Sequence, residues 1–348
     1  MSFLIYGASG YTGKITVEHA IKRGMKPTLA GRTESKIKPI ADEFGLDYLI
    51  FGLDDIEIIA KNLANFPLVL NCAGPFSRTA KQMIKACLQA GTHYLDITGE
   101  IEVFELAKSF HQKAIEKNII VMSGVGFDVV PTDCMSKHLH NKLPDATHLE
   151  LAWFGVGGSI SHGTMSTMVE NLGKSGAIRK DGKITLSPTG EFSKEVEFNG
   201  KKYFSMSIPW GDVSTAHFTT GIPNITVFTG VPKNTYTIMK FQKLFNPIVS
   251  INFVRNQIQK YVDKNITGPN EAQREKGKSF IYGKVSNAKG DVAEARLQTA
   301  EGYKLTAEMS LIITQKVLAD KTLKPGYHTP AELFGADLIL EMPGSKFL

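Results

Sequence analysis

Three glycines near the start of the chain have the spacing of a phosphate-binding turn. Gly7, Gly10 and Gly13 directly follow the short apolar run from Phe3 to Tyr6. Such glycines let a strand turn sharply, let the backbone approach a pyrophosphate and let the next helix pack closely on the sheet. Phosphates then lie at the start of that helix, where N–H groups and the helix dipole favour negative charge. A plain glycine turn is the alternative. The pattern predicts a dinucleotide ligand, held by Gly7, Ser9, Gly10, Tyr11, Thr12 and Gly13.

The end of the second predicted strand indicates which dinucleotide is bound. An acidic residue at this place, about 20 residues past the glycine loop, would grip the ribose 2′-hydroxyl of NAD. Here the strand Pro27 to Gly31 is followed by Arg32 and Thr33. A guanidinium is a planar, permanently charged fork that suits a 2′-phosphate, and Thr33 adds a hydroxyl donor. The sequence therefore favours NADP(H), with NAD(H) and a non-contacting surface arginine as alternatives.

The first third of the chain alternates short apolar runs with segments of helical length. This alternation predicts an α/β fold with a parallel, doubly wound sheet of the Rossmann type and helices on both faces. One helix is expected over Thr79 to Ala90, ending at Gly91. Pro39 is expected in the first turn of a helix that starts late. Further strands are predicted at Leu49 to Phe51, Leu68 to Leu70, Tyr94 to Ile97 and Ile119 to Met122.

The fourth strand runs into Asn71-Cys72-Ala73-Gly74-Pro75-Phe76. Ligands of doubly wound folds bind at the carboxyl edge of the sheet, where this segment lies. We expect Ala73, Gly74, Pro75 and Phe76 to form a wall for the nicotinamide end, with a structural turn as the alternative. Cys72 has no partner base in the sequence, so a small buried strand residue is favoured over a nucleophile.

Two carboxylates follow the sixth strand, in the segment Gly124 to Asp133. Asp133 could cap a helix beginning near Cys134, whereas Asp128 lies too far upstream to do so. Asp128 is therefore a candidate for orienting a substrate or moving a proton, with a turn-stabilising role as the alternative. The segment Tyr94 to Glu100 raises the same question, and Glu100 could instead begin a helix.

Composition limits the protein class. The chain has 348 residues, 42% of them hydrophobic, which predicts a globular protein of two domains. The net charge of +6 comes from scattered residues without a nucleic-acid motif, so we expect no nucleic-acid partner. Three cysteines without metal-ligand spacing predict no metal site and a reducing, cytoplasmic compartment. No signal peptide is expected, because the first strand starts by the third residue.

From about Thr147 the period changes to that of a mostly antiparallel sheet. Asp181-Gly182 and Asn199-Gly200 are hairpin signals. A glycine-rich loop, Gly157 to Thr164, precedes a helix and could bind a carboxylate or phosphate. Its His162 could move a proton at neutral pH, or be an uninvolved loop residue. The remaining strands are expected at Leu149 to Phe154, Ile225 to Val231, Ser279 to Val285 and Val292 to Thr299.

Residues 236–261 combine many apolar and aromatic side chains with lysines and arginines. The charges and Pro247 argue against a transmembrane segment. Peripheral membrane contact or a homodimer surface is one interpretation, and a helix buried in its own domain is the other.

Together these motifs resemble the saccharopine dehydrogenase-like oxidoreductases, a family that includes bacterial trans-acting enoyl reductases. The resemblance implies a Rossmann domain, a second α+β domain and NAD(P)-linked reduction. Asp128 is similar to an aspartate that lies near substrate and nicotinamide in saccharopine reductases. Phe127 and the Val-Val-Pro that follows Asp128 depart from that pattern, which favours an apolar over an amino-acid substrate. The motifs lie at residues 7–13, 30–32, 71–76, 94–100, 126–133, 162–164, 268–269 with Arg274, 329–331 and 334–335.

The sequence thus predicts an NADP(H)-dependent oxidoreductase acting on a C=O, C=N or activated C=C group of a small-molecule or lipid-like substrate. The alternatives are an NADP(H)-binding scaffold without turnover and a saccharopine-type reductive amination enzyme. We expect a Rossmann domain over 1–131, completed by 303–348, and an α+β substrate or dimerisation domain over 132–302. Tyr303 to Leu318 is predicted to be helical, and Ala331 to Leu340 to return to the cofactor domain.

Overall fold

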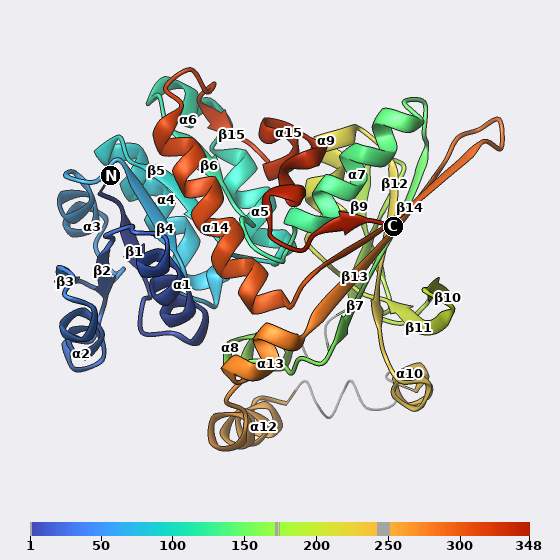
Figure 1. The fold of residues 1–348 in the computed structure, drawn as a ribbon, viewed down its shortest axis with the longest axis horizontal. Helices are drawn as coiled ribbons and strands as arrows, with labels where there is room; N and C mark the ends of the chain where they lie inside the picture. Colours follow the sequence, from blue (N-terminus) through green and yellow to red (C-terminus); the bar gives the residue numbers. More distant parts are fainter. Residues whose placement is uncertain (1, 171–172, 174, 242–250) are drawn as a thin grey trace. The chain divides into compact units, whose positions relative to one another are not determined.

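The computed structural model describes residues 2–170, 173, 175–241 and 251–348, which form two compact units (Figure 1). The first unit consists of Met1–Val130 and Tyr303–Leu333, and the second of Pro131–Gly302 and Phe334–Leu348. The sequence analysis expected all of residues 303–348 to complete the first domain, whereas only Tyr303–Leu333 group with it. Residues from Phe334 onward group with the second unit, because β16 (Lys346–Phe347) pairs with its strand β14 (Val292–Ala300).

A parallel sheet forms the centre of the first unit. The strand order is β3-β2-β1-β4-β5-β6-β15, and the chain changes direction across the sheet between β1 and β4. Strands β1, β2, β4 and β6 are buried along their whole length, as expected where helices cover both faces. The predicted α/β sheet is confirmed. Its strands are β1 (Leu4–Tyr6), β2 (Thr28–Gly31), β3 (Tyr48–Ile50), β4 (Leu68–Asn71), β5 (His93–Asp96), β6 (Ile120–Met122) and β15 (Gly326–Tyr327).

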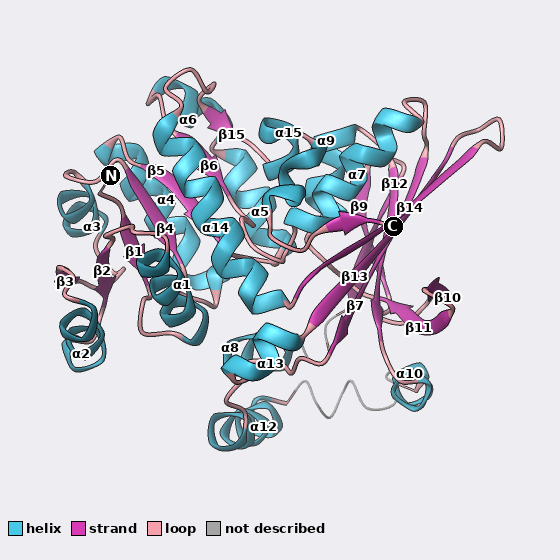
Figure 2. Cartoon of the chain, viewed as in Figure 1, coloured by secondary structure: helices cyan, strands magenta, loops and turns pink. Residues whose placement is uncertain are grey.

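Helices connect these strands (Figure 2). α14 brings a segment distant in sequence to this unit, because Glu308 bonds His19 and Arg23 of α1. The helices of the unit are α1 (Tyr11–Lys22), α2 (Glu34–Phe44), α3 (Ile56–Leu63), α4 (Phe76–Ala90), α5 (Ile101–Ser109), α6 (His111–Glu116), α14 (Gly302–Ala319) and α15 (Pro330–Phe334).

The expected late start of the second helix is wrong. α2 begins at Glu34, so Pro39 lies in its interior rather than its first turn. The buried face of the helix, which includes Ile37 against Gly31, outweighs the cost of a proline within it. Gly45 ends the helix in the left-handed conformation.

A mixed sheet forms the centre of the second unit, in the order β10-β11-β12-β7-β13-β14-β16, with β8 joining β12 to β9. β7 and β12 run parallel and their other described neighbours run antiparallel, as the sequence predicts. Asp181 and Asn199, with the glycines that follow them, have positive φ, so both predicted hairpin turns form. The strands not yet bounded are β7 (His148–Val156), β8 (Gly176–Lys180), β9 (Lys183–Ser187), β10 (Ser193–Phe198), β11 (Lys201–Ser207), β12 (Asn224–Gly230) and β13 (Lys278–Ser286).

α7 of this unit begins earlier than expected, at Val130 rather than near Cys134. Pro131 permits this start, because the first turn of a helix does not need its missing N–H. Asp133 therefore lies inside the helix and not before it, and its buried carboxylate accepts a hydrogen bond from Thr219. The described helices of the unit are α7 (Val130–Lys142), α8 (His162–Glu170), α9 (Asp212–Thr220), α10 (Lys233–Lys240), α12 (Asn252–Asn265), α13 (Glu271–Lys276) and the 3-10 helix η1 (Ala336–Glu341).

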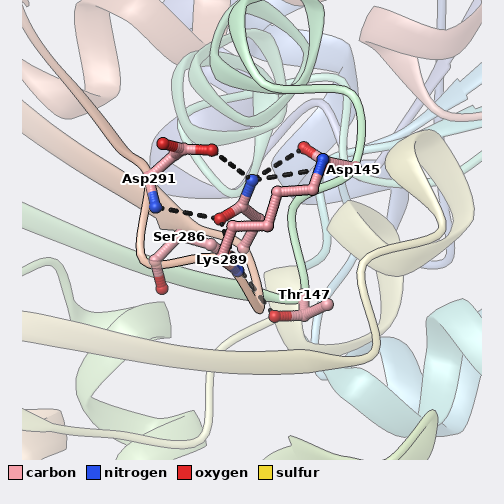
Figure 3. A network of polar contacts seen from close by, with 6 residues as sticks. Asp145, Thr147, Ser286, Lys289 and Asp291 are labelled. Atoms are coloured by element: carbon pink, nitrogen blue, oxygen red, sulfur yellow. Dashed lines mark hydrogen bonds and ion pairs between the residues drawn. The ribbon is translucent and has the colours of Figure 1, made fainter.

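A polar network fixes the tip of the β13–β14 hairpin (Figure 3). The Asn287 amide nitrogen donates to both oxygens of Asp145, at 3.1 Å each, and to Asp291 Oδ2 at 2.9 Å. The Asn287 amide oxygen accepts from the backbone N–H groups of Lys289 and Asp291. One buried amide thus joins the hairpin to the segment that leads into β7.

Part of the predicted apolar segment 236–261 lies outside the described residues, namely 242–250. On either side of that gap, large side chains are exposed, namely Phe241 (55%) before it and Phe253 (68%) and Tyr261 (65%) after it. The helix α12 is therefore exposed at Phe253 and Tyr261, although Asp263 near its C-terminal end contacts His162 of α8. Within the described residues, no helix is both long and apolar enough to cross a membrane.

Candidate functional site

The parallel sheet brings four predicted elements to one edge. The glycine turn follows β1, Arg32 follows β2, Ala73 lies two residues past β4, and the loop bearing Asp128 follows β6. Because the strands run parallel, their carboxyl ends share an edge. The change of chain direction between β1 and β4 is the point where such sheets bind ligands.

The glycine turn is shaped so that side chains would obstruct it. A Cβ on Gly7, whose φ is +83°, would lie 2.7 Å from the Ala73 nitrogen, and a Cβ on Gly13 would lie 2.2 Å from the Gly7 oxygen. Within 4 Å of a Cβ placed on Gly10 there is one atom, the Gly7 oxygen, at 3.3 Å. Gly10 is exposed and lies directly before α1, which it cannot cap because it has no side chain. The start of α1 therefore fits a phosphate, whose oxygens would accept the N–H groups of its first turn.

The other predicted residues of this turn differ in burial. Ser9 is exposed, and Tyr11 and Thr12 are half-buried. The Tyr11 ring packs edge-on against Tyr303 of the α14 segment, with ring centroids 5.1 Å apart. The Thr12 carbonyl accepts from the Thr16 hydroxyl within α1. Contact of these side chains with a cofactor stays a prediction.

Arg32 and Thr33 lie between β2 and α2, and both side chains are exposed. Thr33 directly precedes α2, and its hydroxyl does not cap that helix. A cation and a hydroxyl are thus available at the strand neighbouring the glycine turn. This arrangement fits the 2′-phosphate of NADP.

The predicted nicotinamide wall, Ala73 to Phe76, connects β4 to α4. Its far end is fixed by Glu100, whose carboxylate accepts from the backbone N–H of Phe76 at 2.8 Å and of Ser77 at 2.9 Å. Glu100 directly precedes α5, as expected, but its side chain caps α4 instead of α5. The start of α4 is thereby occupied by a carboxylate, which leaves α1 as the better anion site.

Asp128 lies just before α7, and its carboxyl packs against Gly99. A Cβ on Gly99 would lie 3.1 Å from the Asp128 Cβ, Cγ and Oδ2 atoms. Phe127 N–H donates to the Thr306 hydroxyl on α14, at 3.0 Å, and so holds the loop. Burial raises the pKa of Asp128 to about 7. A carboxyl group with this pKa can both give and take a proton near neutral pH.

His162, the second predicted catalytic residue, belongs to the second unit and is the first residue of α8. Its Nε2 lies 2.8 Å from Asp263 Oδ1 on α12, and both side chains are about half exposed. The Ser161 hydroxyl caps α8 by accepting a hydrogen bond from the Thr164 N–H, at the place where the glycine-rich loop was predicted to bind an anion. The structure thus gives His162 a contact between two helices of its own unit.

The three cysteines are free and buried. Burial raises the pKa of Cys72 to about 12 and the pKa values of Cys87 and Cys134 further above their usual range. A thiolate is the reactive form, so none of these residues is suited to act as a nucleophile.

The sequence pattern did not predict that the polar residues at the ends of β4 and β5 act together. Asn71 and Asp96 are register partners on these strands, and both are completely buried. The hydroxyl of Tyr94 lies between their side chains. The available signal was a polar residue at the end of each of two otherwise apolar strands. The sequence indicates polar groups in the segment 94–100, but only the register between β4 and β5 shows that Asn71 is the partner of Asp96.

Comparison with known proteins bears on the cofactor domain and on the fold. Residues 3–122 match the family model described as the saccharopine dehydrogenase NADP binding domain. The human saccharopine dehydrogenase-like oxidoreductase is 27% identical over 202 residues, covering 51% of this chain and 47% of the human protein. The lipid droplet localized protein of Caenorhabditis elegans is 27% identical over 231 residues, covering 57% of this chain and 54% of that protein. The chain therefore matches about half the length of these curated relatives.

The fold has a solved counterpart over its whole length. Apo saccharopine dehydrogenase (L-Glu forming) from Saccharomyces cerevisiae superposes with a TM-score of 0.66 at 13% identity, covering 100% of this chain and 99% of that one. At this identity the likeness concerns the fold. Residues 3–122 thus match a saccharopine dehydrogenase NADP binding domain, in agreement with the glycine turn and Arg32 that the same residues contain.

Proposed function

We propose that the chain is an NADP(H)-dependent oxidoreductase that transfers hydride to or from a C=O, C=N or activated C=C group of a small-molecule or lipid-like substrate. The observation that carries the proposal is the position of the glycine turn, Arg32 and the Ala73–Phe76 segment. They follow β1, β2 and β4, at the point where the sheet changes direction.

Each element has a separate role toward the cofactor. The start of α1 beside Gly10 holds the pyrophosphate, Arg32 and Thr33 hold the 2′-phosphate, and Ala73 to Phe76 lie along the nicotinamide. The cofactor supplies the hydride, while the protein supplies position and proton transfer.

Asp128 is the proposed proton-transfer group. Its loop follows β6 at the same edge of the sheet, and its pKa of about 7 suits exchange with a substrate oxygen or nitrogen. His162 is already paired with Asp263, so we assign it no step. Asp128→Asn should lower turnover while leaving the dissociation constant for NADPH unchanged. Equal turnover by the variant would remove Asp128 from the mechanism.

Calorimetry with NADPH and NADH tests the cofactor assignment. Replacing a charged hydrogen-bond partner costs about 1.5–3 kcal/mol, so Arg32→Ala should weaken NADPH binding by roughly 10- to 150-fold and leave NADH binding unchanged. Lys26→Ala removes one exposed positive charge before the other end of β2 and serves as the control. Absence of heat with either coenzyme would end the proposal.

Turnover separates the proposed enzyme from its alternatives. Deuterium at C4 of NADPH should pass stereospecifically to one member of a panel of carbonyl, imine and enoyl compounds. Tight NADPH binding without transfer to any of them would favour a scaffold. Transfer that requires an amino-acid partner would instead indicate reductive amination.

Exposed apolar side chains support peripheral lipid contact as a second candidate function. Ile251, directly before α12, and Phe253 and Tyr261 of α12 are each more than half exposed. A relative's name, lipid droplet localized protein, points the same way. Flotation with phosphatidylcholine vesicles should recover the wild-type chain and recover less of Phe253→Ser. Concentration-dependent self-association without flotation would favour a homodimer surface.

A further inference from the structure

A chain of hydrogen bonds connects the buried ends of β4 and β5 to the backbone of Ala73. Asn71, Tyr94 and Asp96 are each completely buried. Tyr94 and Asp96 belong to β5, and Asn71 is the last residue of β4. Ala73 is the residue that lies against Gly7 of the glycine turn.

The chain starts at Asp96, whose oxygens accept four hydrogen bonds. Oδ1 accepts from the backbone N–H groups of Thr98 and Gly124, each at 3.0 Å. Oδ2 accepts from the hydroxyls of Tyr94 at 2.7 Å and Ser123 at 2.8 Å. Burial raises the pKa of Asp96 to about 6, and these bonds counteract that rise. The Tyr94 hydroxyl therefore donates its hydrogen to the Asp96 carboxylate.

This hydrogen bond orients the amide of Asn71. Because the single hydroxyl hydrogen of Tyr94 is donated to Asp96, the Tyr94 oxygen can only accept a further hydrogen bond, and it lies 3.4 Å from Asn71 Nδ2. Thr79 Oγ1 donates to the Ala73 carbonyl at 2.7 Å, so it too can only accept from Nδ2, at 3.4 Å. Asn71 Oδ1 must then face the other way, where it accepts from the Ala73 N–H at 3.0 Å. Side chains thus hold both polar groups of Ala73.

We propose that Asn71, oriented by Tyr94 and Asp96, is the positioning residue for the nicotinamide half of the cofactor. It acts by locking Ala73, the first residue of the segment that would lie along the nicotinamide. The inference rests on the proposed function and deepens it. Asn71 affects the ring end of the cofactor, whereas Arg32 and the start of α1 hold the adenosine and phosphate end.

A pair of ligands tests this division. NADPH and 2′-phospho-ADP-ribose share the adenosine phosphates, but the second lacks the nicotinamide. Thr79→Val removes the hydroxyl that holds the Ala73 carbonyl, and Asn71→Ala removes the amide. Loss of one hydrogen bond of about 1 kcal/mol should weaken NADPH binding about fivefold in Thr79→Val, and more in Asn71→Ala. Binding of 2′-phospho-ADP-ribose should stay within about twofold.

Thr92→Val is the matched control. Thr92 is buried directly before β5, at its opposite end, where its hydroxyl oxygen lies 3.1 Å from the Leu63 carbonyl oxygen and 3.0 Å from that of Phe66. It should lower the melting temperature without changing either dissociation constant. Should Asn71→Ala fail to fold, Thr79→Val carries the comparison alone.

The outcomes are distinct. Selective loss of NADPH affinity supports the inference. Equal losses for both ligands, or no loss in folded variants, overturn it while leaving the proposed function in place. If the wild-type chain binds neither ligand, the proposed function fails and the inference fails with it.

Discussion

Alanine substitutions at Gly13 and Gly10 should separate folding from cofactor binding. Both glycines flank the start of α1 and have ordinary negative or extended backbone conformations, so alanine is not excluded by φ. The difference lies in what the new methyl group would meet. At Gly13 the obstacle is backbone, namely the Gly7 oxygen at 2.2 Å and the Ala8 Cα at 3.0 Å.

The cost at Gly13 can be worked from these distances. Carbon–oxygen contacts lie at about 3.3–3.6 Å, so α1 must move by about 1 Å. Overpacking costs typically 1–3 kcal/mol, and a backbone obstacle places Gly13→Ala near 3 kcal/mol. Alanine regains about 1 kcal/mol of helix propensity, which leaves about 2 kcal/mol. For a unit of this size that loss lowers the melting temperature by about 4–8 °C.

Thermal unfolding by circular dichroism and NADPH titration by calorimetry measure the two effects. Gly13→Ala should lose stability and affinity together. Gly10→Ala should melt close to the wild type, because the Gly7 oxygen at 3.3 Å needs to move by only a few tenths of an ångström. It should bind NADPH much more weakly, because the proposed phosphate site is at the start of α1, directly after Gly10. Gly155→Ala, with no atom within 4 Å of its Cβ, is the neutral control. A wild-type melting temperature for Gly13→Ala would refute the packing argument, and full affinity in Gly10→Ala would refute the phosphate assignment.

Three further outcomes are expected. Burial alone would raise the pKa of Glu308, but hydrogen bonds from His19 and Arg23 of α1 outweigh it and lower the pKa to about 2. Glu308→Gln should therefore lower the free energy of unfolding by about 1–2 kcal/mol, after allowance for solvent screening. That difference should be complete above pH 4.5 and shrink as pH falls toward 2; a constant difference in acid unfolding would contradict it. Asn287→Asp sets a third carboxylate beside Asp145 and Asp291 and should lower the melting temperature at pH 7, less so in high salt; an unchanged or salt-independent melting temperature would speak against the network. Because Cys72, Cys87 and Cys134 are all buried, a thiol reagent should modify the native protein slowly and the unfolded protein fully. Rapid labelling of the native protein would show that at least one of these thiols is accessible.

The sequence determined the local features of the cofactor domain. Apolar runs of strand length, the glycine spacing and Arg32 each act over a few residues, so the parallel sheet and its phosphate-binding turn could be predicted without knowledge of distant contacts. The two hairpins of the second unit were predictable for the same reason, because Asp-Gly and Asn-Gly supply the positive φ values their turns require.

Features that depend on distant partners could not be predicted in this way. Pro39 was misplaced because burial of α2 against β2 outweighs the local preference of proline. The grouping of Phe334–Leu348 with the second unit was not predicted, because the pairing of β16 with β14 spans about 50 residues of chain. Glu100 was recognised at a helix start, but which helix it caps depends on how α4 and α5 pack.

The sequence by itself thus specified which dinucleotide chemistry the first unit can support, since turn conformation and charge are properties of neighbouring residues. Only the tertiary structure decided how Asn71, Tyr94 and Asp96 act together. Their partnership arises from the register between two parallel strands separated by a helix, and register is set by packing over the whole sheet.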